Sequence, residues 1–326
     1  MAPPVDWLSR LLALVPVRGR LDIYCTYGAP WRIDQARAEV GEMAYHAVVA
    51  GTATLEDPSR GPPLRLSAGD ILLLPRGEAH VLHDGSGAPA AAAHTRTGSN
   101  LLISENAGAG ERLDMLCGHF MLARPQDRLL RDYLPPRLVV RTADPGAAAT
   151  VSGTRDVLTG LVSLMRHEAV SDSLGGRAML DALSTALFTL TLRLASEARE
   201  TPVGLLALAG HARLAPALSA LFNEPGHPWT LPELARLCNM SRATLARQFQ
   251  ERLGQSASEL LTDIRMTLAA NELRKPSAST GAVAETVGYQ SEAAFQRAFK
   301  QRMGVTPAQW RRAASSTASP VPSLPS

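Results

Sequence analysis

The chain has 326 residues, of which 45% are hydrophobic and 19% are charged, and its formal net charge at pH 7 is +3. This length exceeds that of most single domains, so the composition predicts a modular globular protein and excludes a largely disordered one. The positive charge is localised, because residues 213–312 hold 13 Lys and Arg against 8 Asp and Glu. Such a basic C-terminal segment fits a polyanionic partner, and it also fits an ordinary solvated surface.

Cysteine usage and hydropathy indicate the compartment. Three cysteines at wide spacings, Cys25, Cys117 and Cys238, provide neither a disulfide framework nor a zinc motif, which favours a reducing cytoplasm. No apolar run approaches the roughly 20 residues of a membrane-spanning helix, so we expect no membrane partner. The apolar run near the N-terminus is interrupted by Arg10 and lacks a signal-peptide pattern. It predicts a short helix with residues 7, 8, 11 and 12 on one face.

Residues 20–143 contain short apolar runs of strand length, broken by glycine and proline, and are therefore predicted to be β-rich. The stretch GDILLLPRGEAH, residues 69–80, has the most regular punctuation. We expect a hairpin turn at Gly69 and Asp70, a buried strand over residues 71–74 and a second turn at 75–77. His80 would then enter the next strand.

The hydrophobic period changes to a helical one in residues 152–198, which predicts two amphipathic helices joined near residues 171–176. Their apolar faces require a partner, either the β-rich region, a second subunit or both. After Thr201 and Pro202 a helical region is expected over residues 205–314, and the polar, proline-rich residues 315–326 are expected to be a disordered tail. The predicted fold class is therefore α+β.

A short pattern occurs twice in the helical region, as SRATLARQFQERLG at 241–254 and SEAAFQRAFKQRMG at 291–304. Each copy begins with a serine that can cap a helix, continues with apolar residues four apart, and ends with a glycine suited to a left-handed turn. A second short helix is predicted just before each copy, with Asn239 and Gly288 at the turn. This arrangement is typical of two helix-turn-helix motifs.

The block GYQSEAAFQRAFKQRMGVTPAQWRR, residues 288–312, resembles the C-terminal signature of the AraC/XylS family of bacterial transcription regulators. The stretch LARLCNMSRATLARQF resembles the first helix-turn-helix motif of the same family, and residues 264–274 resemble its connecting helix. The resemblance implies that two recognition helices enter successive major grooves on one face of double-stranded promoter DNA, about 34 Å apart. RNA polymerase is then an expected protein partner.

The resemblance also implies roles for individual residues. Arg247 and Arg297 recur in the same frame, which favours DNA contact over an ordinary surface position, and Gln296 adds a third side chain able to read bases. Alanines at the remaining base-contacting positions leave room for thymine-methyl contacts or for DNA shape. The family's base-contacting positions fall on Ala243, Ala246, Arg247, Ala293, Gln296 and Arg297. The candidates for phosphate contact are Arg242, Ser291 and Lys300.

Residues 69–80 resemble the second motif of the cupin barrel, which AraC-type regulators commonly carry as a sensory domain. Catalytic cupins hold a metal with a His-x-His pair and a Glu of the first motif together with the histidine of the second. Here EMAYHAVVAG has His46 but Val48 at the second position, and Glu56 is remote in sequence. We therefore expect no metal cofactor and no catalysis. A trio of His46, His80 and His83 is the alternative metal site.

Two thiols in the β-rich region, Cys25 and Cys117, are candidate sensors together with His46 and His80. His119 follows Cys117 closely, and a neighbouring imidazolium would lower the pKa of the thiol. Some regulators that combine a cupin with the AraC reader resemble oxidant sensors, and Cys25 is expected just before the barrel, as in those proteins. The alternative is that both cysteines are inert and buried, which is also the simplest interpretation of Cys238.

Together these patterns predict a cytoplasmic transcription regulator that binds specific DNA sequences and responds to a small molecule or an oxidant. The expected domains are a cupin-like sensory domain at 1–145, a helical connector at 146–204 with a possible role in homodimer formation, and the reader at 205–314. Two alternatives stay open. One is a metal-dependent cupin enzyme with helices for assembly, and the other is a regulator whose barrel only dimerises.

Overall fold

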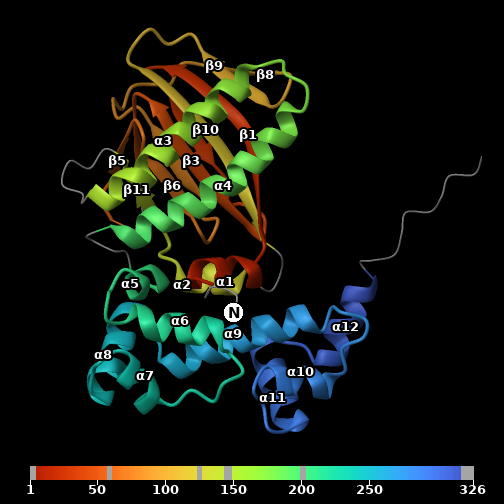
Figure 1. The fold of residues 1–326 in the computed structure, drawn as a ribbon. Helices are drawn as coiled ribbons and strands as arrows, with labels where there is room; N and C mark the ends of the chain where they lie inside the picture. The colour runs from red at the N-terminus through yellow and green to blue at the C-terminus, as the bar shows by residue number, and fades with distance from the viewer. Residues whose placement is uncertain (1–4, 57–60, 123–126, 143–148, 199–202, 317–326) are drawn as a thin grey trace, which may run out of the picture. The chain divides into compact units, whose positions relative to one another are not determined.

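The computed structural model describes residues 5–56, 61–122, 127–142, 149–198 and 203–316 (Figure 1). Two compact units divide the chain, and each is treated by itself below. One comprises Pro16–Ala123 and Leu130–Gly210, and the other comprises Met1–Val15, Arg124–Leu129 and His211–Ser326. The first unit contains the strands and the second is helical, so the predicted α+β class is confirmed.

Two sheets form the β-rich unit, and their described neighbouring strands are antiparallel except for the parallel pair β1 and β9. The larger sheet has the strand order β11 (Leu138–Val140), β6 (Ile71–Leu74), β3 (Glu42–Ala50), β10 (Arg112–Leu122), β1 (Val17–Gly28), β9 (Leu102–Asn106) and β8 (Ala93–Thr97). The smaller sheet has the order β2 (Arg32–Gln35), β7 (His80–His83), β4 (Thr52–Glu56) and β5 (Leu64–Ser67).

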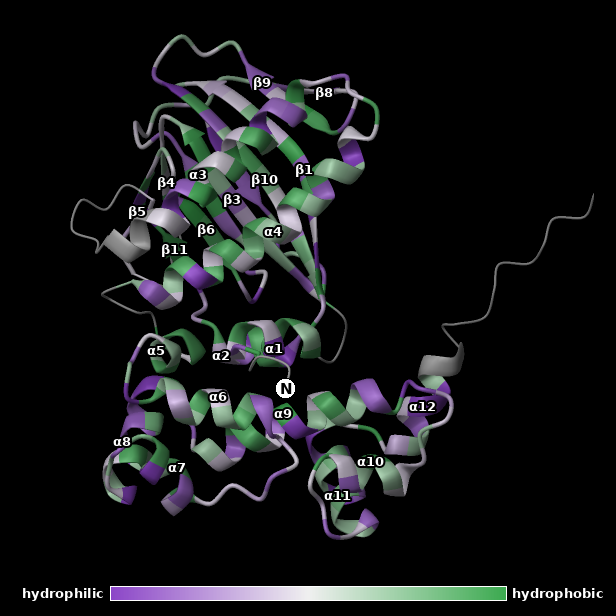
Figure 2. Cartoon of the chain, viewed as in Figure 1, coloured by the Kyte–Doolittle hydropathy of each residue, from purple (hydrophilic) through white to green (hydrophobic). Residues whose placement is uncertain are grey.

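The turns predicted around β6 are present. Gly69 has φ +89° at the hairpin between β5 and β6, and Asp70 accepts a hydrogen bond from the Ser67 backbone N at 2.9 Å. Gly77 has φ +59° in the second turn, and His80 begins β7 with its side chain buried. All four residues of β6 are buried, and Figure 2 shows the strand in the hydrophobic colour. This burial on both faces follows from the layers on either side of the larger sheet.

Helices α3 (Ala149–Val170) and α4 (Gly176–Glu197) cover the face of the larger sheet that points away from the smaller one (Figure 1). The Tyr45 hydroxyl of β3 lies 2.9 Å from Ser184 Oγ of α4, and the rings of Phe120 and Phe188 have centroids 4.8 Å apart. The predicted helix pair thus has the β-rich region as a partner. Among the described helices, α4 alone is long and apolar enough to cross a membrane, and half of its most apolar stretch is buried in the fold.

The remaining helices have the following bounds: α1 (Trp7–Leu14), α2 (Arg128–Tyr133), α5 (Leu205–Ala209), α6 (Ala215–Asn223), α7 (Leu231–Leu237), α8 (Arg242–Leu253), α9 (Ala257–Glu272), α10 (Thr280–Thr286), α11 (Glu292–Met303) and α12 (Pro307–Ser316). The connecting helix α9 begins earlier than the stretch 264–274 that the sequence pattern marks, because Ser256 caps it at its N-terminus. The disordered tail was expected from residue 315, but residues 315 and 316 belong to α12; residues 317–326 lie outside the described residues, and so do Thr201 and Pro202.

Helix α1 forms where the N-terminal pattern predicts a helix, and it packs within the C-terminal unit. The rings of Trp7 and Phe222 have centroids 6.3 Å apart, and Leu11 is fully buried. Asn271 of α9 donates a hydrogen bond from Nδ2 to the Leu14 carbonyl at 2.8 Å. The expected cupin-like domain, residues 1–145, includes this helix. The apolar face of α1 contributes to the core beside α6 and α9.

The helical unit contains two helix-turn-helix motifs, α7–α8 and α10–α11, on either side of α9. The turn residues adopt positive φ, +50° at Asn239 and +82° at Gly288, as the sequence predicts. The turns differ in length, because residues 238–241 separate α7 from α8 whereas residues 287–291 separate α10 from α11. Gly288 is also crowded, since a Cβ atom there would lie 2.3 Å from the Gly226 carbonyl oxygen.

Two glycine-to-alanine substitutions separate backbone strain from crowding. Gly254 has φ +74° with open space around it, so Gly254→Ala should cost about 1 kcal/mol of unfolding free energy for the left-handed conformation alone. Gly288→Ala adds the clash with the Gly226 carbonyl and should cost at least about 1 kcal/mol more. Urea denaturation followed by helical circular dichroism measures both variants. Equal losses would contradict the crowding at Gly288.

Candidate DNA-reading helices and a buried cysteine and histidine cluster

The two candidate recognition helices, α8 and α11, begin and end where the repeated sequence pattern predicts. Ser241 Oγ accepts a hydrogen bond from the Thr244 backbone N at 3.1 Å, and Ser291 Oγ accepts one from the Ala294 backbone N at 3.3 Å. Gly254 and Gly304 end the helices in the left-handed region, with φ +74° and +77°. The caps and glycines fix the length of each helix, so the same side chains face outward in both copies.

The exposure pattern of residues 241–250 repeats residue for residue in 291–300. Leu245 and Phe249 are buried in the first copy, and Phe295 and Phe299 take their places in the second. Arg247 is exposed over 66% of its side chain, and Arg297 is also exposed. The structure therefore places all the candidate DNA-contacting residues on the solvent face of the two helices: Ala243, Ala246, Arg247, Ala293, Gln296 and Arg297, with Arg242, Ser291 and Lys300.

Two of these candidates contact a neighbouring glutamate of the same helix, one through an ion pair and one through a hydrogen bond. Arg247 Nε lies 3.6 Å from Glu251 Oε1, one turn further along α8. Gln296 Nε2 donates a hydrogen bond to Glu292 Oε1 at 2.8 Å on α11. Exposed ion pairs of this kind contribute about 0–1 kcal/mol, so Arg247 can leave Glu251 for a stronger partner. Glu292 is not among the residues predicted to contact DNA, although its spacing of four residues from Gln296 predicts this contact.

A second set of candidates meets in the interior of the β-rich unit. Cys25 of β1, His46 of β3, His80 of β7 and Cys117 of β10 are all buried, with exposed fractions between 3% and 8%. His46 Nδ1 lies 3.1 Å from Cys117 Sγ, and His46 Nε2 lies 2.7 Å from His80 Nε2. Cys25 packs in the same buried core cluster as Cys117, and the two thiols influence each other's pKa. The structure thus joins all four sensor candidates in one chain of contacts.

The strand register explains how these residues meet. Cys117 lies directly opposite His46 in the β10–β3 pair, so both side chains point to the same face of the sheet. In the β1–β10 pair Cys25 lies opposite Met115, which makes Cys25 a diagonal neighbour of Cys117. Their common face looks into the core between the sheets, where Val48, Leu55 and Leu82 are fully buried.

Hydrogen-bond logic assigns the direction of the contacts. His80 Nδ1 lies 3.0 Å from the Glu78 carbonyl, which can only accept, so this nitrogen carries a proton. Neutral His80 then has a lone pair on Nε2, which accepts from His46 Nε2. His46 Nδ1 is left as the acceptor of the Cys117 thiol proton, and Cys117 Sγ can accept from Cys25. Every member of the neutral cluster has a donor or acceptor in place.

The surroundings shift the pKa values of the cluster. Burial, reinforced by His80, lowers the pKa of His46 well below the ordinary histidine value and keeps its imidazole neutral. The Cys117 hydrogen bond lowers the pKa of the Cys25 thiol, and the Tyr27 hydroxyl acts in the same direction. The contact with Cys25, together with burial, raises the pKa of Cys117. Cys25 is consequently the more acidic thiol of the pair.

Two expectations about the cysteines are wrong in detail. Cys25 lies inside strand β1 of the barrel and not ahead of it. His119 does not supply an imidazolium to Cys117, because its Nδ1 pairs with Asp22 Oδ2 at 2.7 Å. Neutral His46 is the imidazole that contacts Cys117, and the second thiol is what lowers the pKa of Cys25. These cross-strand contacts depend on register, which the sequence does not reveal.

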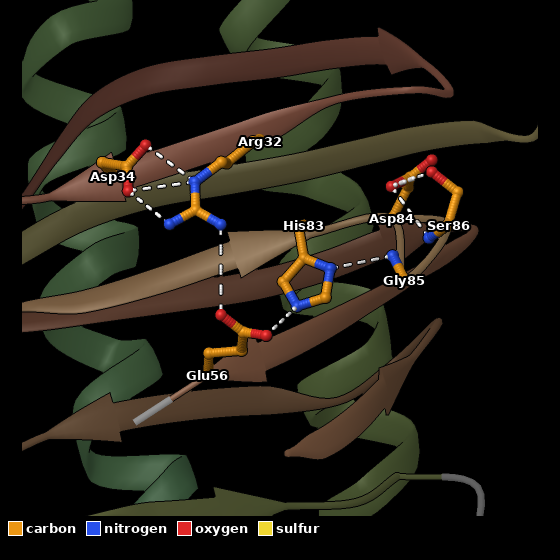
Figure 3. Close-up of polar contacts among 7 residues, drawn as sticks. All are labelled: Arg32, Asp34, Glu56, His83, Asp84, Gly85 and Ser86. Atoms are coloured by element: carbon orange, nitrogen blue, oxygen red, sulfur yellow. Dashed lines mark hydrogen bonds and ion pairs between the residues drawn. The ribbon is translucent and has the colours of Figure 1, made fainter. Parts of the chain in front are cut away.

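The alternative metal trio does not form. Alternation along β7 points His80 into the core and His83 to the outer face of the smaller sheet. There His83 Nε2 lies 3.3 Å from Glu56 Oε1, beside the pair of Arg32 and Asp34 (Figure 3). The described residues contain no group of three or more His, Cys, Asp or Glu side chains that could hold a metal ion.

Comparison with protein families agrees with both halves of the chain. A family model described as "Cupin" matches residues 6–197, and one described as "Helix-turn-helix domain" matches residues 234–313. A barrel of this kind joined to two capped reading helices defines a DNA-binding transcription regulator with a cupin domain. The chain belongs to the AraC/XylS family of such regulators, as the sequence pattern predicted.

Similar proteins include two bacterial regulators over nearly their whole length. An "Uncharacterized HTH-type transcriptional regulator" of Haemophilus influenzae is 31% identical over 312 residues, which cover 95% of this chain and 100% of that protein. The "RCS-specific HTH-type transcriptional activator RclR" of Escherichia coli is 28% identical over 307 residues, with 94% and 97% covered. Among solved structures, the DNA-binding domain of AdpA in complex with a target DNA has 26% identity and a TM-score of 0.30, and it covers 32% of this chain and 96% of that one. These relatives are named as transcription regulators and not as enzymes.

The depressed pKa of His46 predicts a pH dependence of stability. Below about pH 6.5 this histidine is protonated in the unfolded chain but not in the folded chain. Unfolding therefore takes up a proton, and the free energy of unfolding decreases as the pH is lowered. The loss should approach about 1.4 kcal/mol per pH unit as pH falls from 6.5 to 5. His46→Gln should remove this contribution to the slope, as measured by urea unfolding at each pH. His94→Gln, on the exposed strand β8, is the control and should keep it.

Proposed function

We propose that α8 and α11 read promoter DNA by entering successive major grooves, with the residues assigned from the family pattern in contact with bases and phosphates. The observation that carries this proposal is the residue-for-residue repetition of the exposed face in two capped helices. Alanines at Ala243, Ala246 and Ala293 let the helices approach the groove floor closely. Arg247 and Arg297 then supply bidentate donors to guanine, and Gln296 can read adenine.

The same helices carry candidates for phosphate contact. Lys300 of α11 is exposed one turn beyond Gln296, and Arg242 is the first residue of α8. Contacts of this kind position the protein on DNA without distinguishing bases. The serine at the N-terminus of α11 uses its hydroxyl for the helix cap in the free protein, so Ser291 would reach a phosphate from the positive end of the helix.

Replacement of the two cations of α11 distinguishes these roles. Arg297→Ala should weaken binding to a cognate site by about 1–3 kcal/mol and relax the base preference at one position. Lys300→Ala should weaken binding to cognate and unrelated DNA alike. It should also reduce the slope of log K against log salt concentration by about one. Fluorescence anisotropy with cognate and scrambled duplexes at several salt concentrations measures both effects. Sequence-blind losses in both variants would contradict the assignment.

For the cupin domain, the proposal is that it senses a two-electron oxidant, such as a hydroperoxide, through Cys25 and Cys117. The chain of contacts to His80 supports it, because the cluster can relay a proton. When the Cys25 proton passes to Cys117, the Cys117 proton passes to His46 Nδ1 and the His46 Nε2 proton passes to His80. Each contact then reverses its direction and remains satisfied. The Cys25 thiolate forms, and the charge is carried to His80.

A thiolate made in this way attacks one oxygen of the peroxide, which leaves a sulfenic acid on Cys25 and releases an alcohol or water. The Cys117 sulfur then displaces the hydroxyl group as water, and a disulfide forms. Diagonal cross-strand neighbours have Cα atoms about 7–8 Å apart, slightly beyond the usual disulfide range. The bond would therefore pull β1 toward β10 in the sheet that supports α4, where Gly19 of β1 donates to Thr185 Oγ1 at 2.9 Å. This is the proposed route from the barrel to the helices.

Oxidation of single-cysteine variants tests the sensor. Hydrogen peroxide should remove two thiols from the wild type and lower the mass by about 2 Da, because one disulfide forms within the chain. Cys238→Ser, which removes the buried cysteine of the helical unit, should behave in the same way. Cys25→Ser should abolish both the disulfide and any oxidant-dependent change in DNA affinity. DNA binding that is the same in the wild type, Cys25→Ser and Cys117→Ser, with and without peroxide, would favour a barrel that binds an effector or only dimerises.

RNA polymerase and a second copy of the chain are the proposed protein partners. The helices α3 and α4 leave large apolar side chains exposed, among them Val157, Leu164 and Met179. Exposed apolar patches on helices are typical of interfaces, which supports self-association through this pair. Sedimentation at several protein concentrations, with and without cognate DNA, measures the association.

A further inference from the structure

The helical unit contains a cavity of about 270 Å³ between α6, α7, α8 and α9. Its apolar lining includes Leu221 of α6, Leu234 of α7, Phe249 of α8 and Leu261 of α9, all of which are buried. The first recognition helix thus forms one wall of a hollow beneath it. Nothing in the DNA-reading role requires this space, because a packed core would support α8 equally well.

Three of the polar groups that line the cavity are already paired within the protein. Trp229 Nε1 donates to the Glu224 carbonyl at 3.0 Å, and Gln250 Nε2 donates to the Gly254 carbonyl at 3.2 Å. Ser256 Oγ donates to Glu259 Oε2 at 2.8 Å in the cap of α9. None of the lining residues carries a charge. A charged ligand would therefore lose its hydration without gaining a partner, whereas a neutral apolar ligand loses little.

The size of the cavity indicates the size of its occupant. An apolar protein cavity of roughly 150 Å³ accepts benzene, so a space nearly twice as large suits a bicyclic aromatic molecule. The second repeat of this chain offers an internal parallel. There the ring of Trp310 lies against Phe299, the counterpart of Phe249, with centroids 6.4 Å apart, and its Nε1 donates to the Ala270 carbonyl at 2.9 Å. In the first repeat the residue at the position of Trp310 is Leu260.

We propose that this cavity is a binding site for a small, neutral, bicyclic aromatic molecule of about the size of indole. Ala246 lies on the cavity wall and is exposed, and it is also one of the positions assigned to base contact. A ligand held against it competes with DNA for the same helix. This competition rests on the proposed function of α8, whereas the binding itself does not.

The binding test uses the full chain with indole as the probe and calorimetry or ligand-observed NMR as the readout. Indole should bind saturably at one site, and the anion indole-3-acetate should bind at least tenfold more weakly. Ser258→Trp should plug the cavity and weaken indole binding at least tenfold, because Ser258 lines the cavity and is exposed at the second residue of α9. A substitution at this exposed position leaves the core intact, and circular dichroism verifies the fold.

The matched control is Ala308→Trp, which adds the same ring at the second, exposed residue of α12. It should leave the affinity for indole unchanged. Absence of saturable binding, equal binding of the anion, or equal effects of the two tryptophan substitutions would each overturn the proposal.

A separate measurement tests the competition. Saturating indole should lower the apparent affinity of the wild type for cognate DNA at least tenfold and leave Ser258→Trp unaffected. Indole binding with unchanged DNA affinity would overturn the competition while leaving the site in place. A chain that binds indole but prefers no DNA sequence at all would instead contradict the proposed function.

Discussion

The interior of the barrel imposes the constraint on which the cupin half of this protein depends: polar side chains that are buried away from water must satisfy one another's hydrogen bonds. Four strands each contribute one such group. The distances of 3.1 Å and 2.7 Å on the two sides of His46 join Cys117, His46 and His80, and Cys25 packs in the same core cluster as Cys117. Because the tautomer of one imidazole fixes that of the next, a change of charge at one end alters every contact.

The helical DNA-binding unit is organised differently, because the same capped helix occurs in it twice. A serine cap, two buried residues four apart and a terminal glycine fix each helix without reference to the rest of the fold. The repeat is not perfect, since the turn before α11 is one residue longer and Trp310 replaces an aliphatic residue. The two candidate recognition helices therefore have different surroundings, and a cavity lies beside α8.

Local features could be predicted from the sequence and distant contacts could not. The capped helices, the turn at Gly69 and the glycine turn at Gly288 depend on a few consecutive residues, so propensity and spacing were sufficient to place them. The cluster around His46 depends on the register of strands far apart in the chain, and the pairing of His119 with Asp22 followed the same unseen geometry. The members of the cluster could therefore be predicted from the sequence. The imidazole that contacts the Cys117 thiol could not, because it belongs to His46 and not to His119.

The placement of α1 has a practical consequence for dissection of the molecule. The first helix of the chain buries Leu11 and Leu14 among the helices of the C-terminal unit, and Asn271 holds its end. A fragment that starts at residue 211 would keep both reading motifs and yet present an uncovered hydrophobic strip to solvent. Poor solubility of such a truncated reader would then report a missing amino-terminal segment and not a defect in its own folding. A fusion that carries residues 5–15 back to this surface would be the natural form in which to isolate it.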